Sequence, residues 1–167
     1  RRSRRLAERG RMEYRSLSPP DDVEPWIQSV LALEKLGWKG RSGTALASSQ
    51  SSRRYFELIA RDAYRLDRLA MLGLYLDNRA IAMSCKLRAG DGVFAFKTTF
   101  DEAYDQYSPG LLLELEHIVR MHDEPGVRWM DSCAVSDHFL ANRIWRERHT
   151  IETIVVGAGE PGALVVS

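Results

Sequence analysis

Cysteine is scarce in this sequence, which has only Cys85 and Cys133 among its 167 residues. Two cysteines cannot supply the framework of a small disulfide-rich domain, and their scarcity favours a reducing, cytoplasmic compartment. The sequence also lacks any apolar run near the ~20 residues that a membrane-spanning helix needs, and no apolar leader follows the charged first residues. We therefore expect a cytoplasmic protein without a membrane span or a secretory signal.

Proline and glycine are also few and scattered, at 6 and 12 residues, whereas 44% of the residues are hydrophobic. This composition excludes disordered and collagen-like chains, which have too few apolar side chains to form a core. The length is that of one ordinary domain, which can bury roughly 70% of the surface of its unfolded chain. The sequence thus predicts a globular domain with its own core.

The net charge of +1 conceals a basic N-terminus, because residues 1–15 contain seven arginines and two glutamates. A basic arm can bind nucleic acid, but no aromatic side chain interrupts its first ten residues and the rest of the chain is acidic. Nucleic-acid binding is therefore the less favoured interpretation. We expect an Arg-rich linker helix over residues 1–10, followed by one domain over residues 11–167. Because the chain begins with Arg1, we also expect it to be part of a longer protein.

Hydrophobic periodicity and capping residues divide the chain into helices and strands. Three central strands are separated by tight turns at Asp77-Asn78 and Gly90-Asp91-Gly92, which predicts an antiparallel meander. Ser108-Pro109 indicates a helix start, because serine caps helices and proline is tolerated in the first turn. The predicted strands cover residues 12–17, 69–76, 80–87, 93–100, 127–133, 150–156 and 164–166. The predicted helices begin near residues 21, 53, 108 and 136, and the last of them reaches about Arg148. A loop is predicted over residues 38–52.

This order of elements predicts an α/β fold, in which about four helices flank a mixed central sheet of six to seven strands. Several short segments occur along it, namely Leu33-Glu34, Trp38 to Ala45, Phe96-Lys97, Asp101-Glu102, Tyr107 to Gly110, Asp131-Ser132 and Trp145 to Arg148. With these segments in this order, the chain resembles the GNAT acyltransferases over residues 12–156. Within them it is similar to the CelD-like, cellulose-biosynthesis-type branch, which is related to the FemAB peptidoglycan enzymes.

The resemblance implies an N-acyltransferase that moves an acyl group, expected to be acetyl, from a coenzyme-A-type thioester to a primary amine. The donor would be acetyl-CoA or another acyl-CoA, no metal would take part, and the acceptor would be a small molecule or a polymer. A FemAB-like aminoacyl transferase is one alternative. A non-catalytic GNAT-like scaffold is another, in which this chain is one half of a tandem protein with a GNAT-like half upstream.

The resemblance places the donor where the sheet parts between the strands at residues 93–100 and 127–133, with its phosphates at the start of the intervening helix. A helix N-terminus favours an anion because its first N–H groups are free and its dipole is positive there. An ordinary helix cap is the alternative interpretation of this turn. The family's phosphate loop has a basic or Gln residue followed by two spaced glycines. Here Gln106 and the single Gly110 remain, so a carrier-protein thioester or an aminoacyl-tRNA is an alternative donor. The residues implied in donor binding are Gln106, Ser108, Pro109, Gly110 and Leu111.

Acyl transfer to an amine needs a group that takes the proton from nitrogen as the new bond forms. Asp101, at the end of the strand over residues 93–100, is the predicted base. Strand alternation places Lys97 on the same face, close enough to keep that carboxylate ionised. Asp131, near the end of the neighbouring strand, and Glu102 are the alternative bases, and a solvated turn beginning at Asp101 is the non-catalytic interpretation.

In the family the first two helices and their loop form the acceptor side, so the resemblance implies substrate binding by Glu34, Trp38, Lys39 and the turn over Gly40–Gly43. We expect Tyr104 and Tyr107 to line the same cleft. Trp38 could equally cover the core at the end of its helix. Trp145 stands where many GNAT enzymes have a tyrosine that protonates the leaving thiolate, and an indole N–H is a poor acid.

Metal and hydrolase chemistry have little support in the sequence. His117 and His122 are five residues apart, whereas a spacing of four places two ligands on one helix face. His138 and His149 have no partner at ligand spacing, and no Gly-x-Ser-x-Gly elbow is present. We therefore predict no metal site and no hydrolase triad.

Overall fold

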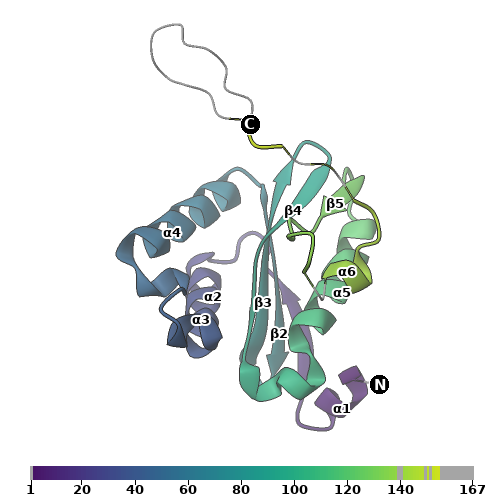
Figure 1. Cartoon of the computed structure of the whole chain (residues 1–167). Coiled ribbons are helices and arrows are strands. Elements are labelled where there is room, and N and C mark those ends of the chain that lie inside the picture. Colours follow the sequence, from purple (N-terminus) through teal and green to yellow (C-terminus); the bar gives the residue numbers. More distant parts are fainter. Residues whose placement is uncertain (1, 139–140, 149, 151, 155–167) are drawn as a thin grey trace, which may run out of the picture. The chain divides into compact units, whose positions relative to one another are not determined.

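The computed structural model describes residues 2–138, 141–148, 150 and 152–154, and the chain divides into two compact units. A single mixed sheet with strand order β1-β2-β3-β4-β5 forms the centre of the first unit, Arg1–Cys133 (Figure 1). β1 to β4 pair antiparallel, and β5 joins β4 in parallel. The strands are β1 (Met12–Ser16), β2 (Leu69–Leu76), β3 (Arg79–Ala89), β4 (Gly92–Phe100) and β5 (Trp129–Asp131). The mixed sheet and the antiparallel meander are thus confirmed, with five strands among the described residues instead of six or seven.

The turn at Asp77-Asn78 shows why the meander could be predicted. Both residues have positive φ, at 48° and 66°, as a two-residue type I′ turn requires, and Asn and Asp adopt this conformation more readily than most residues. The turn joins β2 to β3 directly, with Leu76 opposite Arg79. Asp77 Oδ1 also accepts a hydrogen bond from the backbone N–H of Arg11 at 2.8 Å, which ties the entry of β1 to the hairpin.

The helices lie on both faces of the sheet, as predicted. The elements α2 (Glu24–Leu36), α3 (Trp38–Arg41) and α4 (Gln50–Arg65) lie on one side, and α5 (Pro109–His122) lies on the other (Figure 1). The other helical elements described before residue 134 are α1 (Arg2–Ala7) and two 3₁₀ helices, η1 (Leu46–Ser48) and η2 (Glu102–Tyr107). The predicted loop over residues 38–52 therefore contains two short helices. Within the described part of the chain, no helix combines the length and apolar character that crossing a membrane requires.

Two apolar clusters fill the space on either side of the sheet. Under α2 and α4, Phe56 of α4 stacks on Phe96 of β4 with ring centroids 5.8 Å apart, next to Met83 and Cys85 of β3. On the other face, Leu113 of α5 packs against β2 and β3. Burial of an apolar side chain of this size contributes about 1.5–3 kcal/mol. The two clusters therefore fix which helices cover which face of the sheet.

Helix α1 is part of the packed fold, which differs from the linker helix predicted over residues 1–10. Leu6 is fully buried in the cluster on the α5 face, and the Arg5 guanidinium lies 5.9 Å from the ring centroid of Tyr107. The arginines give the segment the composition of a solvated arm. One apolar side chain at the right position is nevertheless sufficient to bury a face of this short helix against η2.

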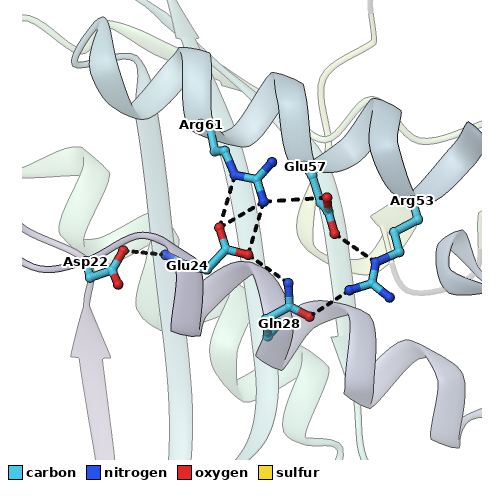
Figure 2. Close-up of polar contacts among 6 residues, drawn as sticks. All are labelled: Asp22, Glu24, Gln28, Arg53, Glu57 and Arg61. Carbon is cyan, nitrogen blue, oxygen red and sulfur yellow. Dashed lines mark hydrogen bonds and ion pairs between the residues drawn. The ribbon is translucent and has the colours of Figure 1, made fainter. Parts of the chain in front are cut away.

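A polar network joins the exposed sides of α2 and α4 (Figure 2). Arg61 of α4 pairs with Glu24 of α2 at 2.9 Å and with Glu57 of its own helix at 3.5 Å. Arg53 pairs with the same Glu57 at 2.8 Å and donates to Gln28 Oε1 at 3.2 Å. Exposed ion pairs contribute little stability individually. The network mainly orients α2 against α4, and the C-terminal end of α2 carries a residue of the candidate site.

The second compact unit comprises residues 134–167 and contains α6 (Ala141–Ile144). This helix is shorter than the predicted one, which was expected to reach Arg148. The Arg148 guanidinium instead donates to the backbone carbonyls of Trp145 and Glu147, which a continuing helix would pair with its own N–H groups.

The two strands predicted at the end of the chain have no described counterpart. Residues 150 and 152–154 are not in a strand. The other residues of the predicted strand over 150–156, and all of the strand predicted over 164–166, lie outside the described residues.

A buried polar cluster joins α5 to the middle of the sheet. Lys86 of β3 is fully buried, and its Nζ lies 2.8 and 2.9 Å from the two carboxylate oxygens of Glu114. One turn further along α5, His117 is 2% exposed and its Nδ1 lies 3.2 Å from Ser84 Oγ. Burial, followed by nearby Lys and Arg charges, lowers the pKa of His117 from 6.5 to about 3. This histidine is therefore neutral in the folded protein near pH 7.

We expect His117 to make the domain sensitive to acid. In the unfolded chain its imidazole takes up a proton below about pH 6.5, whereas in the folded protein it stays neutral down to about pH 3. The stability that depends on this group is complete above the unfolded pKa and falls by about 1.4 kcal/mol per pH unit below it. Urea unfolding near pH 7 and near pH 5 should show this loss. His117→Asn keeps an amide near Ser84 and should lose less stability; an equal loss in both proteins would assign the acid sensitivity to other groups.

Candidate functional site

Strands β4 and β5 separate at the position predicted for the donor cleft. β5 pairs only with the start of β4, from Gly92 opposite Trp129 to Phe94 opposite Asp131. Beyond Ala95, whose backbone hydrogen-bonds to the Cys133 thiol, the outer edge of β4 is not paired with the described β5. Such an edge presents backbone N–H and C=O groups that an extended ligand can bind.

A β-bulge lies in the same part of β4. The register to β3 places Ala95 opposite Lys86 and Lys97 opposite Cys85, so Phe96 is an additional residue on β4. Simple alternation predicts that Phe96 and Lys97 face opposite sides of the sheet. The bulge instead turns Phe96 toward α4, on the same side as the Lys97 side chain. The irregular backbone and the separation from β5 thus occur together.

The five residues predicted to bind the donor lie at the turn from η2 into α5. Gln106 is exposed, Leu111 is partly buried, and Pro109 is the buried first residue of α5. Ser108 adopts a left-handed conformation, with φ of 52°, and its hydroxyl makes no capping hydrogen bond to α5. The helix therefore begins where predicted, but the expected serine cap is not formed.

Gly110 has a packing role that the sequence did not indicate. A Cβ at this position would lie 3.2 Å from Cδ1 of Phe100, which is tighter than ordinary van der Waals contact. The glycine thus allows the start of α5 to approach the end of β4. A bulky side chain here would displace Phe100 and strain the core, so donor binding is better tested at the exposed Gln106.

Three predicted site residues, Glu34, Lys39 and Lys97, lie together on the α2 side of β4. The residue Glu34 is 3% exposed, and its Oε2 accepts a hydrogen bond from the backbone N–H of Leu46 at 2.7 Å. Its Oε1 pairs with Lys97 Nζ and lies 3.8 Å from Lys39 Nζ. Two ammonium groups thus share one buried carboxylate. Burial, followed by the charge of Lys97, lowers the pKa of Lys39.

Trp38 lies next to this cluster and is 59% exposed, so it does not cover the core. Its backbone N–H donates to Glu102 Oε1 at 2.5 Å, and Arg41 donates to Glu102 Oε2 at 2.6 Å. The Arg41 guanidinium, and then the Trp38 N–H, lower the pKa of Glu102. With both oxygens engaged, Glu102 holds α3 against η2, which makes it a positioning residue and a poor candidate for the base.

Asp101 is buried and engaged at both of its oxygens. It is 7% exposed, its Oδ2 pairs with Arg79 at 2.5 Å, and its Oδ1 accepts from the backbone N–H of Ala103 at 3.0 Å, which caps η2. The predicted pairing of Lys97 with Asp101 is therefore wrong, because Lys97 pairs with Glu34 on α2. This geometry favours a structural role for Asp101.

Asp131 ends β5 on the same side of the sheet as Lys97. It is in register with Phe94, whose partner Leu87 packs with the cluster under α2 and α4. At about 3.3 Å per residue, this register places Asp131 ~10 Å along the strand from Lys97 and ~23 Å from Asp101. Its Oδ1 accepts from the backbone N–H of Cys133 at 2.7 Å, and the residue is partly buried. Asp131 is therefore the predicted carboxylate that lies at the separation of β4 from β5.

Tyr104 and Tyr107 lie in the core on the α5 face, not beside Glu34 as expected. Tyr107 is 8% exposed and belongs to the cluster that contains Leu6, and Tyr104 packs against that cluster. The Tyr107 ring lies toward α1, where Arg5 is over it. The rings of both tyrosines therefore contribute to packing, on the face of the sheet opposite to Glu34.

Two ion pairs of this region were not predicted from the sequence. Arg41 and Arg79 pair with acidic residues that are distant in the sequence, Glu102 and Asp101 respectively. No local spacing could have indicated either pair, because each forms only when η2 lies against α3 and β3.

The described residues hold no group of three or more His, Cys, Asp or Glu side chains that could bind a metal ion. Burial, and then the Asp131 charge, raise the pKa of Cys133, so its thiol is protonated at neutral pH and is a poor nucleophile. The polar groups on the α2 side of β4 therefore offer charge binding and, through Asp131, proton transfer.

Several solved structures with a similar fold are acetyltransferases. One is AAC(6')-Iy in complex with the bisubstrate analogue CoA-S-monomethyl-acetylneamine, at 14% identity and a TM-score of 0.59, covering 90% of this chain and 99% of its own. An aminoglycoside acetyltransferase from an uncultured soil metagenomic sample, in complex with sisomicin, is 11% identical with a TM-score of 0.56 and coverages of 91% and 97%. A Trypanosoma brucei acetyltransferase is 12% identical with a TM-score of 0.56 and coverages of 87% and 99%. These likenesses show the fold.

The sequence itself also matches a known family. No curated protein sequence matches the chain. However, the sequence model of the acetyltransferase (GNAT) domain matches residues 1–139, a span that includes all five strands and every residue of the candidate site. The chain therefore belongs to the acetyltransferase (GNAT) domain family.

Proposed function

We propose that this domain transfers an acetyl group from acetyl-CoA to a primary amine of its acceptor. The observation that carries the proposal is the separation of β4 from β5 next to the N-terminus of α5. The outer edge of β4 over residues 96–100, which the described β5 leaves unpaired, suits an extended pantetheine arm, and the start of α5 suits its phosphates. Neighbouring structures with a CoA-linked analogue or with sisomicin support an amine acceptor.

In this proposal Asp131 takes the proton from the attacking amine, directly or through one water. The amine nitrogen forms a bond to the thioester carbon, the carbon–sulfur bond breaks, and the thiolate leaves and takes a proton from water. A carboxylate is a weak base toward a free amine, but the nitrogen becomes acidic as the new bond forms. Asp131 is preferred over Asp101 because it lies at the strand separation and keeps one oxygen outside its hydrogen bond to Cys133.

We also propose that the chain falls in the CelD-like branch related to FemAB, and that an upstream GNAT-like half accompanies it. The single glycine at the phosphate turn supports the relation to FemAB, because the FemAB relatives use an aminoacyl-tRNA as donor. A carrier-protein thioester and an aminoacyl-tRNA are therefore the alternative donors to test beside acetyl-CoA.

The direct test is release of free thiol from acetyl-CoA in the presence of a panel of primary amines, together with thermal unfolding in acetyl-CoA alone. Ligand at a hundred times its dissociation constant should stabilise the fold by about 2.7 kcal/mol. Stabilisation by acetyl-CoA without turnover of any amine would mean that the panel does not contain the acceptor. If neither effect is seen, the non-catalytic scaffold becomes the better interpretation.

We expect Gln106→Glu to weaken acetyl-CoA binding about tenfold, because it adds a negative charge beside the proposed phosphate position. Gln106 is exposed, so the unfolding temperature without ligand should not change. Isothermal titration at low ionic strength measures the effect, and added salt should reduce it. Asp123→Asn, at the other end of α5, is a control that should leave the affinity unchanged; equal affinities of Gln106→Glu and the wild type at low salt would place the phosphates elsewhere.

A further inference from the structure

We infer that the acceptor carries an oxyanion, a carboxylate or a phosphate group, which binds at Lys39 and Lys97 on the α2 side of β4. The inference rests on the proposed acyl transfer to an amine and specifies the chemical class of the acceptor.

The first argument is the imbalance of charge at Glu34. Lys97 and Lys39 both lie against Oε1 of this one carboxylate, whose other oxygen is bound to the Leu46 backbone. The neighbouring Arg41 does not alter this balance, because Glu102 neutralises it. Among the residues that the structure describes, one positive charge in this cluster therefore has no matching negative charge.

The second argument is that the excess charge is accessible. The Lys39 side chain is 35% exposed and that of Lys97 is 18% exposed, whereas the Glu34 side chain is 2% exposed. A ligand that approaches the cluster therefore meets the two ammonium groups and not the carboxylate. The exposed Trp38 ring, 5.7 Å from Lys39 Nζ, provides an apolar surface beside them for the remainder of the ligand.

The third argument is energetic. Two ammonium groups that share one buried carboxylate repel each other, and the Lys97 charge contributes to the lowered pKa of Lys39. An oxyanion that binds both groups removes this repulsion and forms charge-assisted hydrogen bonds. A second cation at the same place would increase the repulsion. The cluster therefore discriminates against acceptors with further amino groups.

The register also sets a length. The proposed proton acceptor Asp131 lies ~10 Å along the strand from Lys97, so the reacting amine and the oxyanion must be separated by several bonds. A chain of five methylene groups spans about two extended residues, or ~7 Å. An ω-amino acid of this length can place its carboxylate at the lysines and its amine toward Asp131.

The test compares acceptors that share this chain and differ at one end: 6-aminohexanoate, 5-aminopentyl phosphate, hexylamine and 1,6-diaminohexane. With the full chain and saturating acetyl-CoA, we expect kcat/KM to be at least about tenfold higher for the two anionic amines than for hexylamine, and lowest for the diamine. Comparison of kcat/KM for 6-aminohexanoate and 5-aminopentyl phosphate shows whether the site prefers a carboxylate or a phosphate.

Variants at Lys39 test whether this cluster causes the preference. Lys39→Met keeps the length of the side chain and should bring the ratio of anionic to neutral amines close to one, whereas Lys39→Arg should retain most of the preference. Lys35→Met removes an exposed charge from the end of α2 and is the matched control, for which we expect no change. Equal rates for 6-aminohexanoate and hexylamine, or a preference that Lys39→Met leaves intact, would overturn the inference.

A binding measurement separates this inference from the proposed function. Isothermal titration of 6-aminohexanoate and of hexylamine into the protein measures their affinities without turnover, and the ratio of the two affinities reports the contact with the oxyanion. One outcome is that acetyl-CoA does not bind, whereas 6-aminohexanoate binds at least tenfold better than hexylamine and loses this advantage in Lys39→Met. That outcome would support the oxyanion site and contradict the proposed acyl transfer. If the rate of acetylation does not depend on the charge at the other end of the amine, the result supports acyl transfer and contradicts the oxyanion site.

Discussion

Asp131→Asn should lower kcat for acyl transfer about a hundredfold and leave acetyl-CoA affinity unchanged. The asparagine keeps the shape of the side chain and its hydrogen bond from the Cys133 N–H, which is 2.7 Å from Asp131 Oδ1 in the wild type. It cannot take a proton from the amine. Steady-state thiol release gives kcat, and titration of acetyl-CoA gives the affinity of the donor.

Asp101→Asn is the matched control, because it removes a carboxylate of the same size from the end of β4. We expect kcat to stay within about threefold of the wild type, since Asp101 pairs with Arg79 and caps η2. Asparagine is also a good N-cap, so the main loss should be that of one ion pair, about 1 kcal/mol of unfolding free energy. A folded but inactive Asp101→Asn beside an active Asp131→Asn would return the role of base to Asp101.

The elements that were predicted correctly are those with local causes. The Asp77-Asn78 hairpin follows from two side chains that tolerate positive φ, and the start of α5 follows from Pro109. The meander then follows from short turns, which force consecutive strands to pair. These features need only a few neighbouring residues, so the sequence was sufficient to place them.

The side-chain partners of the candidate site could not be predicted in the same way. Lys97 was assigned to Asp101 by strand alternation, but a buried glutamate 63 positions away, Glu34, lies closer to it in the fold. The bulge at Phe96 places the Phe96 and Lys97 side chains on the same side of the sheet, and no local signal indicated it. Pairing across elements depends on how α2 lies on the sheet, which is determined by packing and not by spacing.

The N-terminal helix illustrates the opposite error, in which composition outweighed a single residue. Six of the first ten residues, counting only Arg and Glu, are charged, which suggested a separate linker. Leu6 nevertheless reaches the core. A charged segment can belong to a domain if it contributes one buried apolar side chain, because burial of that side chain contributes more than exposed charges do.

Glu114→Gln should destabilise the domain by about 3–5 kcal/mol, because it leaves the fully buried Lys86 ammonium without a counter-charge. The amide has the same size as the carboxylate, so the loss reflects charge and not a cavity. Urea or thermal unfolding near neutral pH measures the change. Glu116→Gln, whose wild-type carboxylate pairs with Arg120 on the more exposed side of the same helix, is the control and should cost less than about 1 kcal/mol.

The double variant Lys86→Met, Glu114→Leu distinguishes a buried charge from a general packing defect. It removes both charges and replaces them with apolar side chains of similar volume, so its stability should return close to that of the wild type or exceed it. If the losses of unfolding free energy in the two single variants add up in the double variant, the two residues act independently, contrary to their 2.8 Å contact. Recovery in the double variant would show that the ion pair mainly compensates the cost of burying Lys86, and that this position beside His117 does not require a charge for the fold.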